Sequence, residues 1–553
     1  MFAQTKQKEQ MKKLVLALLL CAIWGTQAQK TLSADYSVKV SEPYRVVDAD
    51  YKWLLSNDGD IVSLKFDGKD IYIQRFDGTK PAYLGEKKYE SYLPKNYVVE
   101  QVKEFKNRYY VFYSSWDGDN QKEQLFAAEV DFAKGEFTGT PRLLLQVNGK
   151  ISGKYSGRAY DFQLRDKFEI LTSTDSKAIL VKYRKKPEVK NDKKSFDIIG
   201  LGTFDADLKK VSVKEIVMPY TERRMNNLDY QIDNDGNLYM LTKIFHDDSN
   251  DDKKKRKDTL ANYHVELFTI KSGSDKLNIS KLENKDKFIT SLWIFDSPSS
   301  PDLIAGGYYS NGKGKDFTKS CDGIMTFKMK EDGTVSEPSY YDIPVELINE
   351  YESGKTKRKN EKKEEKGEGA KFTDLKLKEL KIERDGSMIL IGEQTFILAH
   401  TTGGNMGSRT YYTYHYNDIL ATKIDASGKL AWMRKIPKQQ TGTNGQGGMS
   451  FDFFGVLNEY FLVFLDNVKN IDLPTDKQPA AHTDGKGGYL TGVRIAGADG
   501  NYTKGSILNA REVEDFKLHQ FSVDRIVKIS ETSFVLEAYK KSKEDVMIKV
   551  TLK

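Results

Sequence analysis

The chain is poor in cysteine and has no long apolar run, and both absences exclude whole classes of protein. Its 553 residues include two cysteines, Cys21 and Cys321, which is too few for a cysteine metal cluster. If an N-terminal segment containing Cys21 is removed, Cys321 stands alone and no intrachain disulfide can form. No later stretch approaches the roughly 18 consecutive apolar residues that a transmembrane helix needs. An exported chain without disulfides must rest on its own core, which favours a large bacterial β-protein.

The chain also lacks a strong net charge and the sequence motifs of common enzymes. Its formal charge is +7, and removal of residues 1–28, with four lysines and one glutamate, lowers this to +4. A charge this small gives no reason to expect a nucleic acid partner. The six histidines form no zinc motif, and neither a nucleophile elbow nor a phosphate-binding loop is present. The sequence therefore predicts no cofactor and favours a binding protein over an enzyme.

The N-terminus has the layout of a secretory signal. Lys12 and Lys13 precede an apolar run from Leu14 to Trp24, and small residues follow before Gln29. We interpret residues 1–28 as a signal peptide, with Met11 as a second candidate start, and residues 29–553 as a single domain. This predicts export to the periplasm, the outer membrane or the extracellular space.

The chain repeats one pattern several times: a strand, a tight Gly-containing turn and a second strand. Such turns occur at 56–60, 66–69, 233–237, 331–334, 384–387 and 426–429. Asp-Gly and Asn-Gly pairs favour the turns that join antiparallel strands, and repetition along a chain is typical of repeat architectures. Aromatic residues make up 12% of the chain, which suits many half-buried strands.

The strand-rich units indicate a ring. We place them near 51–85, 98–145, 158–218, 227–283, 288–343, 374–437, 449–508 and 523–553, and the last unit holds only three strands. An unattached strand at 35–41 can complete it, because ring closure removes open sheet edges. We predict an all-β fold, a β-propeller of seven or eight four-stranded blades closed by the N-terminal strand; a pair of β-sandwiches is the alternative.

Three Lys-rich segments interrupt the strand pattern, at 184–194, 246–258 and 353–371, and we expect solvated insertions there. The second contains Asp247, Asp248 and Asp251, whose alternating oxygen ligands resemble part of a calcium loop. Lysines follow where such a loop needs a closing acidic residue. These aspartates are therefore weak calcium candidates, and we predict no metal site.

Residues 400–418 (HTTGGNMGSRTYYTYHYND) differ from every other unit. Alternation places Tyr412, Tyr414 and Tyr416 on one face of a strand, and Tyr411, Thr413 and His415 on the other. Tyrosine combines an apolar ring with a polar hydroxyl, which suits sugars and peptides. The ligand-binding candidates are Tyr411, Tyr412, Tyr414, His415, Tyr416 and the nearby Asp418. The alternative is ordinary packing between neighbouring blades.

Four segments in this region carry a family resemblance: GEQTF at 392–396, YYTYHYNDI at 411–419, KIPKQ at 435–439 and DNVKN at 466–470. Over about 375–470 the chain resembles an exported, propeller-like family of the Bacteroidetes that has no assigned activity. The resemblance implies a Gram-negative cell-envelope or secreted location and implies no catalytic residues.

We therefore expect an exported binding or scaffold protein of the cell envelope, a monomer with a protein or glycan partner. A polysaccharide hydrolase or lyase with its site in the central propeller cavity is the second hypothesis, since two facing carboxylates cannot be seen before the ring is folded. A structural part of a secretion or motility assembly is the third, and it predicts a flat interface instead of a pocket.

Overall fold

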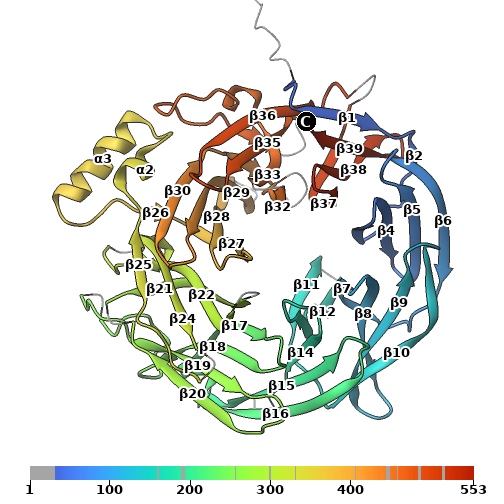
Figure 1. Ribbon diagram of the computed structural model, residues 1–553, viewed down its shortest axis with the longest axis horizontal. Helices are drawn as coiled ribbons and strands as arrows, with labels where there is room; N and C mark the ends of the chain where they lie inside the picture. The colour runs from blue at the N-terminus through green and yellow to red at the C-terminus, as the bar shows by residue number, and fades with distance from the viewer. Residues whose placement is uncertain are drawn as a thin grey trace, which may run out of the picture.

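The chain folds into antiparallel sheets that succeed one another around a ring, a β-propeller (Figure 1). The structure is a computed structural model that describes residues 32–158, 161–187, 194–255, 257–284, 286–297, 300–314, 316–330, 332–404, 407–443, 449–456, 459–483, 487–513 and 517–553. In this part of the chain, six sheets contain four strands each, one contains five and one contains six, and we refer to these eight sheets as blades 1 to 8.

The first four blades follow the chain from the inner strand of each sheet to its outer strand. Blade 1 has β3 (Tyr51–Asn57), β4 (Asp60–Asp67), β5 (Asp70–Asp77) and β6 (Ala82–Glu90); blade 2 has β7 (Val98–Phe105), β8 (Arg108–Asp117), β9 (Lys122–Asp131) and β10 (Glu136–Asn148). Blade 3 has β13 (Phe168–Thr172), β14 (Ala178–Arg184), β15 (Phe196–Asp205) and β16 (Lys210–Thr221); blade 4 has β17 (Met225–Ile232), β18 (Leu238–Phe245), β19 (Tyr263–Ile270) and β20 (Leu277–Leu282).

The remaining blades keep this plan with small additions. Blade 5 has β21 (Phe288–Ser297), β22 (Ser300–Ser310), β24 (Gly323–Met329) and β25 (Ser339–Asp342); blade 6 has β27 (Leu375–Ile382), β28 (Met388–Gly404), β29 (Gly407–Ile424) and β30 (Leu430–Ile436). Blade 7 has β32 (Asp452–Val456), β33 (Glu459–Asp466), β35 (Tyr489–Ala496) and β36 (Tyr502–Asn509); blade 8 has β37 (Gln520–Ser530), β38 (Ser533–Lys541), β39 (Glu544–Leu552) and β1 (Tyr36–Val40).

Short elements lie between and beside the blades. They are β2 (Tyr44–Arg45), β11 (Lys154–Arg158), β12 (Asp161–Arg165), β23 (Ser320–Cys321), β26 (Phe372–Thr373), β31 (Gln440–Gly442), β34 (His482–Thr483), the 3₁₀ turns η2 (Glu222–Arg224), η3 (Phe317–Lys319) and η4 (Val468–Asn470), and the helices α2 (Val345–Asn349) and α3 (Gly354–Glu365). Among the described residues, no helix is both long and apolar enough to cross a membrane.

The two ends of the described chain meet in blade 8, as the unattached N-terminal strand predicts. β1 pairs antiparallel with β39 from Tyr36 opposite Leu552 to Val40 opposite Ile548. The pairing covers an edge of β39 that would otherwise be open to another chain. It therefore gives blade 8 its fourth strand.

The core is divided among hydrophobic clusters that lie between successive blades. One cluster joins Ile391 of blade 6 to Phe464 of blade 7, and another joins Phe461 of blade 7 to Val550 of blade 8. A further cluster packs Val535 of blade 8 against residues of blade 1. Each blade thus buries both of its faces against neighbours, which two separate β-sandwiches would not do.

The contact between the last and first blades also contains buried charges. Lys65 Nζ lies 2.6 Å from Glu537 Oε1 and 3.2 Å from Asp545 Oδ2, and the Tyr44 hydroxyl donates to Glu537 Oε1 at 2.7 Å. Burial, together with the nearby Arg525 guanidinium, lowers the pKa of Lys65 to about 8. These groups satisfy one another only when blade 8 sits against blade 1, so they favour that one neighbour.

The Gly-containing turns gather on one edge of the blades. Five of the six follow the first or third strand of a blade, and the sixth, at 66–69, follows a second strand. The turn glycines have positive φ, for example 88° at Gly59 and 82° at Gly428, where a side chain would be strained. Since strands alternate in direction, connections after second and fourth strands leave from the opposite edge. In the part of the chain that the structure describes, the long insertions leave from that opposite edge.

The Lys-rich segment at 353–371 differs from the solvated irregular insertion expected there, because most of it is helical. Ser353 caps α3 by accepting a hydrogen bond from Thr356 N at 3.2 Å. Asn360, on the buried side of α3, donates to Asn349 Oδ1 at 2.8 Å. Lysine and glutamate are good helix formers, and the segment has no proline to interrupt a helix. Part of the 184–194 segment lies outside the described residues.

Candidate functional site

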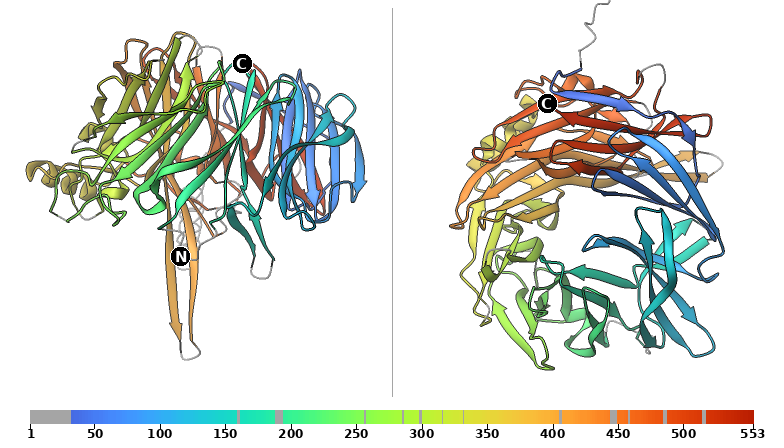
Figure 2. Two further views of the ribbon diagram at one scale, coloured as in Figure 1. Left: turned by 90° about the horizontal axis from the view of Figure 1, so that it is seen from below. Right: turned by 45° about the vertical axis from the view of Figure 1, so that its right-hand side comes forward.

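The most distinctive feature of the ring is a long two-stranded ribbon in blade 6. Figure 2 shows it projecting well beyond one face of the propeller, with the shorter β11–β12 hairpin on the same side. β28 and β29 pair from Met388 opposite Ile424 to Gly404 opposite Gly407. Beyond the body of the blade, residues 396–404 extend about 30 Å at roughly 3.4 Å per residue. We call residues 396–415 the ribbon.

The register of the ribbon confirms the alternation expected for its tyrosines. Tyr414 lies opposite Ile397 and Tyr412 opposite Ala399, on the same face as Tyr416. The other face carries Tyr411, Thr413 and His415, opposite His400, Leu398 and Phe396 respectively. Both faces of the ribbon therefore present aromatic and apolar side chains.

On the histidine-bearing face, the side chains hold one another in place. The His400 ring stacks on Tyr411 with centroids 4.9 Å apart, and the His415 ring stacks on Phe396 at 4.6 Å. The Thr413 hydroxyl bridges the two histidines, at 2.8 Å from His400 Nε2 and 2.9 Å from His415 Nε2. Burial, reinforced by His400, lowers the pKa of His415. The His415 imidazole is thus neutral near pH 7 and serves as a hydrogen-bonding aromatic group.

Much of the ribbon is open to solvent. On β29, Tyr412 is 52% exposed and Tyr411 45%, and on β28, closer to the ring, Ile397 is 58% and Leu398 44% exposed. Tyr414, His415 and Tyr416, nearer the ring, are partly buried. Exposed apolar side chains of this size on a projecting element mark an interaction surface more often than a monomer surface.

A buried polar network anchors the base of the ribbon. Lys438 Nζ donates to Glu393 Oε1 at 2.6 Å, to Tyr416 O at 3.0 Å and to Gln440 Oε1 at 3.0 Å. Ser450 Oγ donates to the other oxygen of Glu393 at 2.7 Å. The side chains of Lys438 and Glu393 are both 0% exposed. All three ammonium hydrogens of Lys438 have acceptors, which is what burial of a charge requires.

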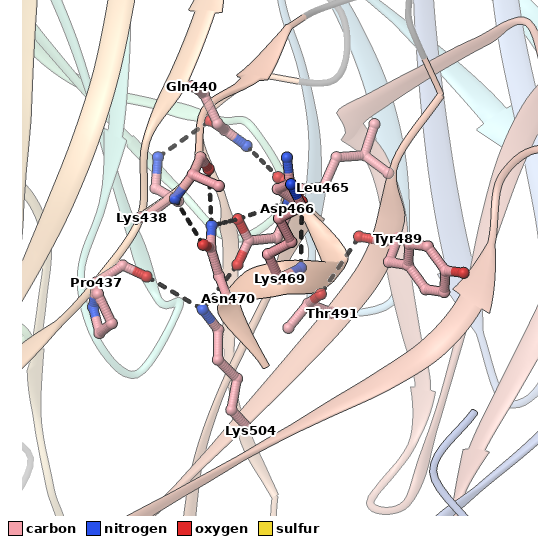
Figure 3. A network of polar contacts seen from close by, with 12 residues as sticks. Pro437, Lys438, Gln440, Leu465, Asp466, Lys469, Asn470, Tyr489, Thr491 and Lys504 are labelled. Carbon is pink, nitrogen blue, oxygen red and sulfur yellow. Dashed lines mark hydrogen bonds and ion pairs between the residues drawn. The ribbon is translucent and has the colours of Figure 1, made fainter. Parts of the chain in front are cut away.

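The network continues into blade 7 through Gln440 (Figure 3). Gln440 Nε2 donates to Leu465 O at 2.7 Å, and the adjacent Asp466 pairs with Lys504 Nζ at 2.7 Å. Asn470 Nδ2 donates to the second carboxylate oxygen of Asp466 at 2.7 Å. Blades 6 and 7 are thus joined by hydrogen bonds as well as by their apolar cluster.

The four segments that carry the family resemblance meet in this network. Glu393 comes from 392–396, Lys438 from 435–439, Asp466 and Asn470 from 466–470, and the segment 411–419 supplies Tyr416 and Asp418. Asp418 is buried, with its Oδ2 3.1 Å from Lys435 Nζ and its Oδ1 accepting from Lys438 N at 3.1 Å. Asp418 therefore supports the ribbon, whereas Tyr411 and Tyr412 face outward. The sequence does not predict the pairing of Glu393 with Lys438, although both residues lie in segments that carry the resemblance.

The aspartates considered for calcium lie in the connection between β18 and β19. Asp247 Oδ1 accepts from the Ser249 hydroxyl at 2.5 Å and from Asn262 Nδ2 at 2.9 Å, which lowers the pKa of Asp247 to about 2. Within the described residues, no group of three or more His, Cys, Asp or Glu side chains is arranged to hold a metal ion. Asp247 acts here as a turn-forming acceptor, and neither Asp248 nor Asp251 joins it in a ligand cluster.

The inner strands carry a second set of titratable groups, around the centre of the ring (Figure 1). Burial raises the pKa of Glu100 on β7 to about 7 and that of Asp229 on β17 to about 6. Asp452 on β32 has its pKa raised to about 7, first by burial and then by the charges of Glu379 and Asp524. Perturbed carboxyl groups of this kind are common in active sites and also occur in structural networks.

Comparison with known proteins identifies no family for this chain. No family model and no curated protein matches the chain. Similar solved structures include the Dos1 propeller, with a TM-score of 0.36 and 10% identity over 92% of this chain and 94% of that one. The β-propeller domain of the Trilobed protease from Pyrococcus furiosus has a TM-score of 0.29 and 9% identity, covering 72% of this chain and 98% of its own.

A prolyl endopeptidase is also similar, with a TM-score of 0.35 and 9% identity over 92% of this chain. The present chain covers 55% of that enzyme, so it spans about half the enzyme's length. At identities this low and TM-scores below 0.5, these similarities carry no argument about what this chain does.

Proposed function

We propose that the protein is an exported, non-enzymatic binding or scaffold protein of a Gram-negative cell envelope, and that the ribbon is its recognition element. The signal-like N-terminus and the resemblance to an exported family of the Bacteroidetes support the location. The projecting ribbon supports the binding role, and its exposed rings supply the contact surface.

The composition of the ribbon is the observation that carries this proposal. Residues 396–415 contain one charged side chain, Arg409, whereas 30% of the whole chain is charged. Tyrosine enrichment with loss of Lys, Glu and Asp is the composition of protein–protein interface cores. Tyr, Ser, Gly and Asn together are also the residues that binding loops use for adaptable contacts. A ribbon held out into solvent without a partner would gain nothing from this composition.

Photo-crosslinking in cells tests the ribbon as the recognition element. A photoreactive phenylalanine replaces Tyr412 in one strain and Leu84 of blade 1 in another, since both residues are 52% exposed. We expect one defined adduct from position 412 and none from position 84. A second variant joins Thr395 to Tyr416 through Asn-Gly in place of the ribbon, because these two residues are cross-strand partners. Equal adduct patterns from both positions, or a partner retained without the ribbon, would contradict the proposal.

The second hypothesis, a polysaccharide hydrolase or lyase, has one observation in its favour. Burial raises the pKa of Asp452, and the charges of Glu379 and Asp524 raise it further. Both of these acidic groups therefore interact with Asp452 around the ring centre. One protonated and one ionised carboxyl group is what glycoside hydrolysis requires. Release of reducing ends or unsaturated products from a panel of bacterial and algal polysaccharides would support an enzyme. The activity would then have to disappear in Asp452→Asn and persist in the variant without the ribbon.

A further inference from the structure

The outer edge of β28 is open along the ribbon. β27 pairs with β28 only as far as Gln394, and Thr395 N then donates to Asp374 O at 2.9 Å. From Phe396 to Thr401, β29 is the neighbouring strand on one side, and no strand of the described chain lies on the other side. The outward peptide groups of this stretch therefore form a row available for pairing.

This edge lacks the features that normally protect an exposed strand. Natural sheet edges are made unsuitable for pairing by lysines, prolines, bulges or short length. Residues 396–401 (FILAHT) contain no charged residue and no proline. The register between β28 and β29 also runs without a shift from Thr395 to Gly404. The edge is thus regular, uncharged and long enough for a strand of about six residues.

We propose that an extended segment of a partner protein adds to this edge of β28 as a third strand; this rests on the proposed function of the ribbon. Main-chain hydrogen bonds to residues 396–401 would supply the affinity, and side chains on alternate positions the specificity. Ile397 and Ala399 would flank the added strand on one face, and Leu398 and His400 on the other. The matching segment is therefore uncharged, with β-branched or aromatic residues pointing to both faces.

Two physical arguments favour a protein strand over other occupants. A two-stranded ribbon is marginally stable in water, and a third strand is the ordinary way to stabilise it. A glycan would stack on the exposed rings and leave the row of peptide groups unpaired. A second copy of this chain pairing ribbon to ribbon would double the mass. The three occupants therefore predict different measurements.

A peptide copied from β29 is a suitable probe, because β28 already pairs with that sequence on its other edge. The probe is the capped heptapeptide TYYTYHY, residues 410–416, followed by two lysines for solubility. The control replaces its central threonine with proline, which removes a main-chain donor. With the full chain and saturating probe, amide hydrogen exchange of residues 396–401 is expected to slow by about tenfold or more. The proline peptide is expected to leave that exchange unchanged.

Two variants separate strand addition from contact through side chains alone. Ala399→Lys places a charge at the edge and is expected to weaken the probe about tenfold, whereas Ala399→Thr keeps strand propensity and is expected to stay within about threefold. Thermal unfolding of both variants checks that the fold is unchanged. Equal protection by the proline peptide, or equal binding by the lysine variant, would overturn the proposal.

The same exchange measurement on the complex crosslinked through position 412 distinguishes the two proposals. A defined adduct without protection of residues 396–401 would refute strand addition and leave the binding function standing. Absence of any adduct would remove the binding function itself. A ribbon-dependent dimer in sedimentation, or glycan binding without amide protection, would also overturn strand addition.

Discussion

The buried pair of Glu393 and Lys438 allows a quantitative test of how the ribbon is held. We propose Lys438→Met, Glu393→Met and the double variant, which remove one charge, the other, or both at similar volume. Lys438→Met removes the three hydrogen bonds that the ammonium group donates, at 2.6, 3.0 and 3.0 Å. In that variant Glu393 keeps its contacts with Ser450 at 2.7 Å and with Lys378 at 3.5 Å. Removing one partner of a buried ion pair costs about 3–5 kcal/mol, so each single variant should lose about that much unfolding free energy.

The double variant should lose about as much as either single variant, because no charge is then left unpaired. Some loss remains, since Ser450 and Gln440 each lose a partner at a cost of about 1–3 kcal/mol. The expected coupling energy is therefore about 3 kcal/mol or more. Urea denaturation followed by fluorescence at pH 7 measures all four proteins, with equal slopes as the check on two-state behaviour. Two single variants within about 1 kcal/mol of wild type, or additive losses, would refute this account.

The pH dependence of the unfolding free energy provides a second test of the same ion pair. Burial lowers the pKa of Lys438 below its usual range, and removal of Glu393 lowers it further. Between the folded and unfolded pKa values, the folded state then binds fewer protons than the unfolded state, so stability rises with pH. The deficit of Glu393→Met should therefore shrink from pH 7 toward pH 10. Lys438→Met has no ammonium to titrate and should show no such recovery.

Three further predictions address the ring itself. Tyr36→Ala, which removes a buried ring between β1 and blade 7, should cost about 3–5 kcal/mol in urea denaturation, whereas Leu32→Ala, 48% exposed, should cost less than about 0.5 kcal/mol. Folded Asp452 keeps its proton up to about pH 7, whereas the usual pKa of an aspartate is about 3.8. Wild-type stability should therefore fall by up to about 4 kcal/mol as the pH rises from about 4 to 7, and Asp452→Asn should make this slope shallower. Cys321, buried and with its pKa raised by that burial, should react with a thiol reagent only as fast as the protein unfolds; rapid native labelling would contradict its placement.

The ring plan could be predicted from sequence because its signals are local. Turn glycines at positions such as 59 and 428 must adopt positive φ, and the apolar runs between the turns specify strands that bury both faces. The lone strand at 35–41 could complete the three-stranded last unit, and the structure shows this pairing between β1 and β39. The helix at 354–365 was missed because its high charge resembled a solvated loop, although Ser353 supplied a helix cap.

The candidate site could be predicted only in part. Alternation alone assigned the ribbon tyrosines to their faces, because the side-chain period of a strand is two whatever the register. Sequence could not separate the exposed Tyr412 from the buried Asp418, since both lie in one segment and differ in what surrounds them. Nor could it pair Glu393 with Lys438, which approach one another only when β29 returns along β28.

By itself, therefore, the sequence determined the repeating strand-and-turn unit, its closure by the N-terminal strand and the departure of one unit from its siblings. These follow from backbone preferences and periodicity, which act over a few residues. Only the tertiary structure decided that the departing unit leaves the ring as a ribbon, that the outer edge of β28 is left open along it, and that buried charges from four segments hold its base. Those outcomes depend on burial and on long-range pairing, which no local pattern records.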